Sequence, residues 1–220
     1  MDYQSHMFKF APIVSEVYVM NIVANELSLL MKKMQEEIAK GQFKTLDLLH
    51  HLTSGLKSLY TTMAYDSIET VRVNCGGAGY SVWSGLPNQY TNYSPIPIYE
   101  GDNTVMAQQV TSYIKKLLKG IGKGRPANGY FEYLNDLDKL CQLKCKAKSV
   151  TEFSDITLLE EALKVRAAWH VRDVSVKYGE SKASKHAKKN DLFATDLLQL
   201  TKAHFLYISL RIYRTNVEQR

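Results

Sequence analysis

Residues 6–41 read HMFKFAPIVSEVYVMNIVANELSLLMKKMQEEIAKG, and this stretch indicates the fold class. Its apolar side chains recur in unbroken steps of three and four residues, which places them on one face of an α-helix. They are Met7, Phe10, Val14, Val17, Met20, Ala24, Leu27, Met31, Met34 and Ile38. We expect Gly41 to end this helix. Pro12 predicts that the helix either starts or kinks there.

The same helical spacing resumes after a short connection. The apolar positions are Leu46, Leu49, Leu52, Leu56, Leu59 and Met63, and the pattern continues toward Val73. Gly55 lies inside it and predicts a point where another helix approaches closely. Two long helices joined by a short connection favour an antiparallel pair from a helical bundle.

Three further helical patterns follow. In the first, Asp102, Asn103 or Thr104 can cap a helix whose apolar residues are Met106, Val110, Ile114 and Leu117. The second begins at Thr157, which has capping-box spacing to Glu160. Its expected apolar stripe is Leu159, Ala162, Val165, Trp169 and Val174. The third covers residues 191–213.

Two segments break the helical periodicity. Residues 75–101 hold five glycines, three prolines and five aromatic residues, and we interpret them as an aromatic loop. The glycine-rich basic segment KGIGKGRPANG, residues 119–129, is expected to link two helical sections. No strand alternation of useful length occurs. The sequence therefore predicts an all-α protein.

The net charge, the length of the apolar runs and the N-terminal sequence limit the classes of function that the protein can have. The 220 residues are 45% hydrophobic and carry a formal net charge of +6. Acidic residues are scattered among the lysines, so we interpret this charge first as solubility; a polyanionic small ligand is compatible with it, and nucleic acid is not required. No apolar run reaches the roughly 20 residues that span a bilayer. The N-terminus MDYQSHMFKF lacks a signal-peptide pattern, so we expect an intracellular protein without a membrane span.

The cysteines and histidines do not predict a metal site. Cys75, Cys141 and Cys145 form a sparse, odd set without a second ligand pair, and we interpret them as reduced structural thiols. The histidines, including His51 and His204, show no metal-ligand spacing and are expected to be core or surface residues.

Three places could carry chemistry, and each has a plainer alternative. Gly76, Gly77 and Gly79 allow a bulky or anionic ligand close to the backbone, although by themselves they favour a simple turn. Lys182, Lys185, His186, Lys188 and Lys189 form a basic stretch that is either a solvated face or a phosphate-binding surface.

The third place is Glu100. Its neighbours Ile96, Pro97, Ile98 and Tyr99 are expected to exclude water from the carboxylate in part and to raise its proton affinity, which suits a general base. The following helix start favours the charged carboxylate instead, and a solvated glutamate is the alternative.

The order of these pieces resembles a known family. VNCGGAGYSVWSGLPNQYTNYSPIPIYEGDNTVMAQQ, residues 73–109, closely resembles the C-terminal flavin-binding segment of acyl-CoA oxidases, members of the acyl-CoA dehydrogenase superfamily. DYQSHMFKFAP and HHLTSGLKSL resemble that family's two preceding helical segments, and EALKVRAAW and LTKAHFLYISL are similar to its second helical domain. EGDNTVM, in place of the EGT-type sequence of the dehydrogenases, indicates the oxidase branch.

The resemblance implies a domain plan. Residues 1–120 would form the first C-terminal, FAD-binding helical domain, residues 121–150 a linker, and residues 151–220 part of the second helical domain. The family's N-terminal helical domain and middle β-domain would lie upstream. The chain is then expected to be a fragment of a longer enzyme or a truncated paralogue, inactive by itself.

The resemblance also implies site residues. Glu100 would be the catalytic base that removes the α-proton of an acyl-CoA, and its backbone N–H and a hydroxyl of the flavin's ribityl chain would bind the thioester oxygen. Substrate would contact Tyr99 and Gly101. FAD would contact Gln4, Gly76, Gly77, Asn103 and Thr104, with the two glycines lying against the flavin of the opposite subunit. Ala78 stands where many members have histidine.

The implied reaction forms a trans-2-enoyl-CoA, and O2 is reduced to H2O2. Its implied setting is a homodimer in the peroxisome, although the terminal NVEQR is not a signal of the S-K-L type. The alternative function is a non-catalytic helical interaction partner. Intact Glu100, Gly76 and Gly77 favour the enzyme.

Overall fold

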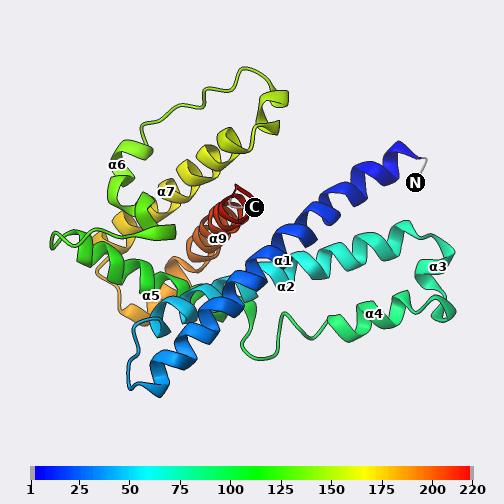
Figure 1. The fold of residues 1–220 in the computed structure, drawn as a ribbon, viewed down its shortest axis with the longest axis horizontal. Coiled ribbons are helices and arrows are strands. Elements are labelled where there is room, and N and C mark those ends of the chain that lie inside the picture. The colour runs from blue at the N-terminus through cyan, green and yellow to red at the C-terminus, as the bar shows by residue number, and fades with distance from the viewer. Residues whose placement is uncertain (1–2, 219–220) are drawn as a thin grey trace.

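A computed structural model describes residues 3–218, and within that range the regular structure is helical throughout (Figure 1). The α-helices are α1 Gln4–Ala39, α2 Leu46–Asn74, α3 Gly77–Tyr80, α4 Leu86–Tyr93, α5 Asn103–Ile121, α6 Leu137–Leu140, α7 Ile156–Glu180, α8 Lys185–Ala187 and α9 Ala194–Glu218. Short 3₁₀ segments cover Val82–Ser84, Gly129–Asp136 and Val150–Ser154, and a π-turn covers Lys188–Leu192. The all-α prediction is confirmed.

Helices α1 and α2 form the expected antiparallel pair (Figure 1). Gly41 has a φ of 68° and ends α1 through two bonds: its N–H donates to the Ile38 carbonyl at 2.9 Å, and the Gln42 N–H donates to the Glu37 carbonyl at 2.8 Å. This is the Schellman arrangement, which satisfies carbonyls at the helix end. The helix begins at Gln4 and carries Pro12 inside, so it does not start at the proline.

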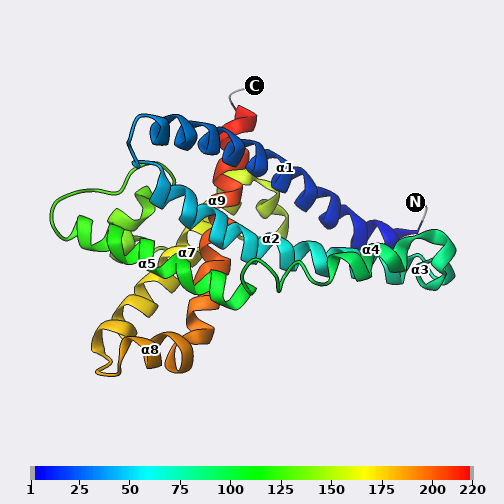
Figure 2. The same cartoon turned by 90° about the horizontal axis from the view of Figure 1, so that it is seen from below.

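Helix α2 lies at the centre of the bundle and packs against α1, α5 and α9 (Figure 2). The close approach predicted at Gly55 is confirmed, and its partner is the Phe205 ring of α9. A Cβ added at Gly55 would lie 1.8 Å from a carbon of that ring. Both residues are buried, and only glycine lets the two helices come this close.

Residues 75–101 are more ordered than the expected loop. They contain α3, the 3₁₀ turn and the two-turn helix α4, which starts directly after Gly85 at a φ of 75°. Pro87 lies in the first turn of α4, where its missing N–H has no helical partner to lose. Two helical turns are too short to produce a periodic apolar stripe, so the periodicity search missed α4.

Helix α7 begins differently from the prediction. Asp155, not Thr157, caps it, because the Asp155 carboxylate accepts the Thr157 N–H at 2.8 Å. Glu160 does not fold back to form a capping box; it is buried and pairs with Arg211 at 3.0 Å and Arg214 at 2.8 Å on α9. Of the expected stripe, Val174 is buried and Leu159, Ala162 and Val165 are half-buried, but Trp169 is 53% exposed. The apolar side chains that α7 buries are Ala167, Ala168, Val171 and Val174.

The segment expected to be a linker contributes to the core. Phe131, Tyr133 and Leu134, from the 3₁₀ segment after α5, are buried in the same cluster as residues of α2, α7 and α9. The chain shares one apolar core across both predicted domains. The domain boundary itself remains a prediction.

Helix α1 is mostly exposed. Among residues 3–218 it is the one helix long and apolar enough to cross a bilayer by length and composition, although its sequence holds no uninterrupted apolar run of that length. In the fold, α1 packs along one side against α2 and α9. It also carries exposed apolar side chains such as Phe8 and Tyr18.

Replacing Gly55 with alanine should destabilise the bundle by about 1–3 kcal/mol, because the added methyl group overpacks the contact with Phe205. Urea unfolding followed by circular dichroism measures this. Gly179→Ala is the matched control, because no atom lies within 4 Å of an added Cβ there. Alanine at that helical position should be neutral or stabilise by up to about 1 kcal/mol. Equal stabilities of the two variants would contradict the close approach.

Candidate active site

Glu100 lies in the turn between α4 and α5, in a strained backbone conformation. It has a φ of 56° and is the only non-glycine residue with positive φ in the described range. The turn is built by the Pro95 carbonyl, which accepts the N–H groups of Ile98 at 2.9 Å and Tyr99 at 3.0 Å. A left-handed backbone at a residue with a Cβ costs about 1–2 kcal/mol and is worth examining for function.

Gly101 explains why a glycine follows the glutamate. Its φ is 102°, a region that residues with side chains rarely adopt. A Cβ at this position would also lie 2.6 Å from the Met106 sulfur. Two consecutive left-handed residues turn the chain into α5, and the Asp102 carboxylate caps that helix by accepting the Thr104 N–H at 2.8 Å. This hydrogen bond is the main cause of the lowered pKa of Asp102.

The turn is docked on the middle of α2. The Lys57 ammonium donates to the Gly101 carbonyl at 2.6 Å, to the Asn103 side-chain oxygen at 2.8 Å and to the Pro97 carbonyl at 3.3 Å. The Asn103 amide donates to the hydroxyls of Thr61 and Thr62, both at 2.8 Å. The Asn103 side chain therefore points at α2, although the resemblance assigned it to the flavin. Thr104 is exposed at the helix start.

Sequence reasoning missed Lys57. The signal was present in HHLTSGLKSL, where a single lysine stands among the apolar positions Leu52, Leu56 and Leu59 of a buried helix. A lysine ammonium group in apolar surroundings needs several hydrogen-bond acceptors, and the neighbouring residues of the sequence do not supply them. Its acceptors therefore had to come from a distant segment.

The expected exclusion of water from Glu100 is not provided by its neighbours. Glu100 is exposed, and Ile98 and Tyr99 are 67% and 48% exposed. The Glu100 backbone N–H donates to no group in the part of the chain that the structure describes. The turn thus presents a carboxylate and an unpaired N–H donor on one residue.

The other predicted site residues gather at the C-terminal end of α2. Gly76 and Gly77 are exposed there, and an added Cβ at either would meet no atom within 4 Å. Gln4 is exposed at the start of α1, which the bond from Lys9 to Asn74 at 2.6 Å ties to the same end (Figure 1). Gly79 differs from them, because it is buried and an added Cβ would lie 1.8 Å from the Arg72 carbonyl oxygen.

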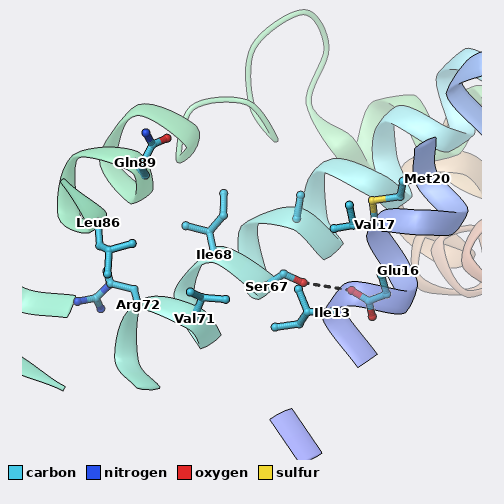
Figure 3. A pocket seen from close by; sticks show the side chains of 11 residues that line it. Ile13, Glu16, Val17, Met20, Ser67, Ile68, Val71, Arg72, Leu86 and Gln89 are labelled. Carbon is cyan, nitrogen blue, oxygen red and sulfur yellow. Dashed lines mark hydrogen bonds between the residues drawn. The ribbon is translucent and has the colours of Figure 1, made fainter. Parts of the chain in front are cut away.

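An apolar cavity lies between α1, α2 and α4 (Figure 3). Its volume is about 330 Å³, and its lining includes Ile13, Met20, Ile68, Val71 and Leu86. Glu16 accepts a hydrogen bond from the Ser67 hydroxyl at 3.1 Å at its side. Glu100 does not line it.

The basic stretch is only partly a solvated face. Lys188 donates to the Tyr178 carbonyl at 2.9 Å, and the Lys115 ammonium lies 3.1 Å from the centre of the Tyr178 ring. Burial is the largest cause that lowers the pKa of Lys115 to about 8, and the charges of Lys185, Lys188 and Lys119 contribute to the same shift. Across residues 3–218 no group of three metal-ligating side chains occurs, and all three cysteines are free.

Two of the histidines form a buried polar chain that the sequence did not reveal. The Tyr133 hydroxyl lies 2.6 Å from His204 Nδ1, and His204 Nε2 lies 3.0 Å from His51 Nε2. Both histidines are buried among Phe131, Phe205 and Tyr113, as core residues. Burial lowers the pKa of His51 to about 3 and that of His204 well below its usual value.

Comparisons with known proteins agree with this arrangement. A family model of the acyl-CoA oxidase C-alpha1 domain matches residues 1–115. Peroxisomal acyl-coenzyme A oxidase 1 of Mus musculus is 30% identical over 219 residues, which is 97% of this chain and 33% of the mouse protein. The human protein of the same name is 31% identical over the same shares.

Two solved structures show the same fold. An acyl-CoA oxidase from Lycopersicon esculentum (tomato) superposes with a TM-score of 0.91 at 28% identity and covers 100% of this chain and 33% of its own. Acyl-CoA oxidase-2 of Caenorhabditis elegans, bound with FAD, ascaroside-CoA and ATP, has a TM-score of 0.82 at 26% identity and covers 100% of this chain and 32% of its own.

The fold and the turn thus define a helical bundle that presents a glutamate at the start of a helix. The chain belongs to the acyl-CoA oxidase family. It spans about one third of the length of the curated relatives that it matches.

Folding stability should fall as the pH drops below about 6.5. The unfolded chain binds protons on both histidines near their ordinary pKa of about 6.5, whereas the folded chain keeps His51 neutral down to about 3. Acid therefore favours the unfolded state through this window, by up to about 1.4 kcal/mol per pH unit for each histidine.

Urea unfolding between pH 7.5 and pH 4.5 measures this slope. His51→Gln should reduce it, and His50→Gln, which removes the exposed neighbouring histidine, should change it little. Equal slopes for the two variants would show that the buried pair does not control the acid sensitivity.

Proposed function

We propose that this chain forms the helical part of an acyl-CoA oxidase in which Glu100 is the catalytic base. The observation that carries the proposal is the Glu100 turn, where an exposed carboxylate and an unpaired backbone N–H belong to one left-handed residue. The reaction is the α,β-dehydrogenation of an acyl-CoA to a trans-2-enoyl-CoA. The partners are acyl-CoA and O2, and the products include H2O2.

The turn suits removal of a proton from carbon. The Glu100 carboxylate accepts the α-proton, which is too weakly acidic to leave unless the negative charge on the thioester oxygen is stabilised. The free Glu100 N–H is a donor for that oxygen, and one such donor contributes about 10²–10³ in rate. Because both groups belong to one residue, the backbone fixes the angle between them, which favours a reactive geometry.

FAD is the cofactor that the family implies, and the residues at the C-terminal end of α2 fit it. The backbone at Gly76 and Gly77 is open, and Tyr80 and Trp83 are 86% and 100% exposed beside it. Gln4 lies at the same end, and Thr104 is exposed at the start of α5. These residues would hold the cofactor. When bound, FAD accepts the β-hydrogen as hydride and passes the electrons to O2.

The remaining expectations follow from the same family. Tyr99, which is half exposed, and Gly101 flank Glu100 in the sequence and would contact the substrate. The exposed apolar side of α1 supports association, and we propose a homodimer in the peroxisome, since the curated relatives are named peroxisomal.

The test is a chimaera in which this chain replaces the matching third of the tomato acyl-CoA oxidase. Glu100→Gln should lower kcat at least about 100-fold, because a positioned general base contributes about 10²–10⁴-fold. Flavin absorbance should not change. Glu36→Gln, which alters an exposed carboxylate on α1, is the control and should leave turnover unchanged. Unaltered turnover in Glu100→Gln would remove Glu100 from its role.

The 220-residue chain alone should be colourless and inactive. Its Glu100 carboxylate is open to water, which weakens the electrostatic stabilisation of the transition state. The measurements are absorbance at flavin wavelengths after addition of FAD and gel filtration, and peroxide release with an acyl-CoA. A yellow chain that releases peroxide would show that the helical part suffices. A chimaera that binds flavin without turnover would favour the alternative, a helical interaction partner.

A further inference from the structure

Lys57 makes three hydrogen bonds, the full capacity of an ammonium group. Two of the acceptors are main-chain carbonyls on either side of Glu100, at Pro97 and Gly101, and the third is the Asn103 side chain. Lys57 is partly buried, and no carboxylate pairs with it in the described part of the chain. All three N–H donors of its ammonium group therefore bind the turn that contains Glu100.

The three bonds do different things. The Pro97 carbonyl also accepts the Asn103 N–H at 3.1 Å. Asn103 is held independently by Thr61 and Thr62, and its carbonyl accepts the Ser58 hydroxyl at 2.8 Å. Within residues 3–218 the Gly101 carbonyl accepts from Lys57 alone. Loss of Lys57 would leave the start of α5 docked on α2 while it released the peptide that follows Glu100.

We infer that Lys57 is the positioning residue for Glu100 and holds its backbone in the left-handed conformation. The left-handed conformation is strained at a residue with a Cβ. A charge-assisted hydrogen bond to the next carbonyl is strong enough to offset that strain. The directions of the Glu100 carboxylate and of its backbone N–H both depend on the hydrogen bonds from Lys57. The consequence for catalysis rests on the proposed function. Lys57 touches neither reacting group, because all three of its donors are used by the turn.

NMR of the 220-residue chain tests whether Lys57 keeps the backbone of Glu100 at a positive φ. A positive φ brings the amide hydrogen of a residue close to its own Hα, so the Glu100 amide should show a strong intraresidue NOE. Lys57→Met should weaken this NOE while the NOEs that link Asn103 to Thr61 and Thr62 persist. Lys57→Arg, which keeps charge and donors, should retain it in large part. Lys116→Met removes an exposed lysine whose partner is Asp47, and should leave it unchanged. An unchanged NOE in Lys57→Met would overturn the inference.

The consequence for catalysis is tested in the chimaera by turnover per bound flavin. Lys57→Met should lower kcat about 10- to 100-fold, because misplacement of a reacting group by about 1 Å costs up to about 10²-fold. The flavin content and the KM for acyl-CoA should change less than about threefold. Lys57→Arg should recover most of the loss, and Lys116→Met should match the parent.

The NMR experiment and the turnover experiment distinguish failure of the inference about Lys57 from failure of the proposed function. A fall in flavin content or in thermal stability with kcat per flavin intact would show a merely structural lysine. A parent chimaera without oxidase activity would refute the proposed function and leave the NOE to decide whether Lys57 holds the turn. A weakened NOE with turnover within twofold of the parent would overturn the catalytic consequence.

Discussion

The close contact between Gly55 and the Phe205 ring determines where α2 lies in the bundle. Buried side chains of α2 face α5 and α9 on both sides of this contact, so the helix has little freedom to slide. Lys57 follows Gly55 by two residues, and the Glu100 turn is bonded to Lys57. The position of an exposed glutamate is thus set by a packing constraint in the interior. Loops placed by a rigid scaffold commonly carry function, and this turn has such a scaffold.

The bundle divides its candidate functional residues between two places. Gln4, Gly76 and Gly77 lie together at the C-terminal end of α2, and Glu100, Gly101 and Asn103 lie near its middle. No atom lies within 4 Å of an added Cβ at either glycine. The Asn103 side-chain amide, in contrast, already donates hydrogen bonds to Thr61 and Thr62. The first place suits a ligand that approaches the main chain. The second suits a reaction that needs one carboxylate in a defined direction.

Much of the architecture could be predicted because long amphipathic helices repeat their apolar residues with the period of the helix. The helix over Met7 to Ile38, its end at Gly41 and the close approach at Gly55 are confirmed. The predicted face of that helix is not the buried one, because Val17 is 59% exposed whereas Val23, outside the predicted stripe, is buried. Glu100 and Gly101 could be chosen as candidates from their motif. Their left-handed backbone could not, because it depends on carbonyls that Lys57 reaches across 40 and 44 residues of sequence. Glu160 was misread for the same reason: its partners, Arg211 and Arg214, lie on another helix.

The buried chain of Tyr133, His204 and His51 joins three segments that are far apart along the polypeptide. Helix α9 supplies His204, as well as Phe205, Ile208 and Ile212 of the core. During synthesis, the earlier helices emerge with the groove around Gly55 empty and with His51 lacking its partner. The bundle can complete its interior only after α9 has left the ribosome. Until then the exposed apolar faces are available to chaperones, and folding of this region is expected to be delayed until late in translation.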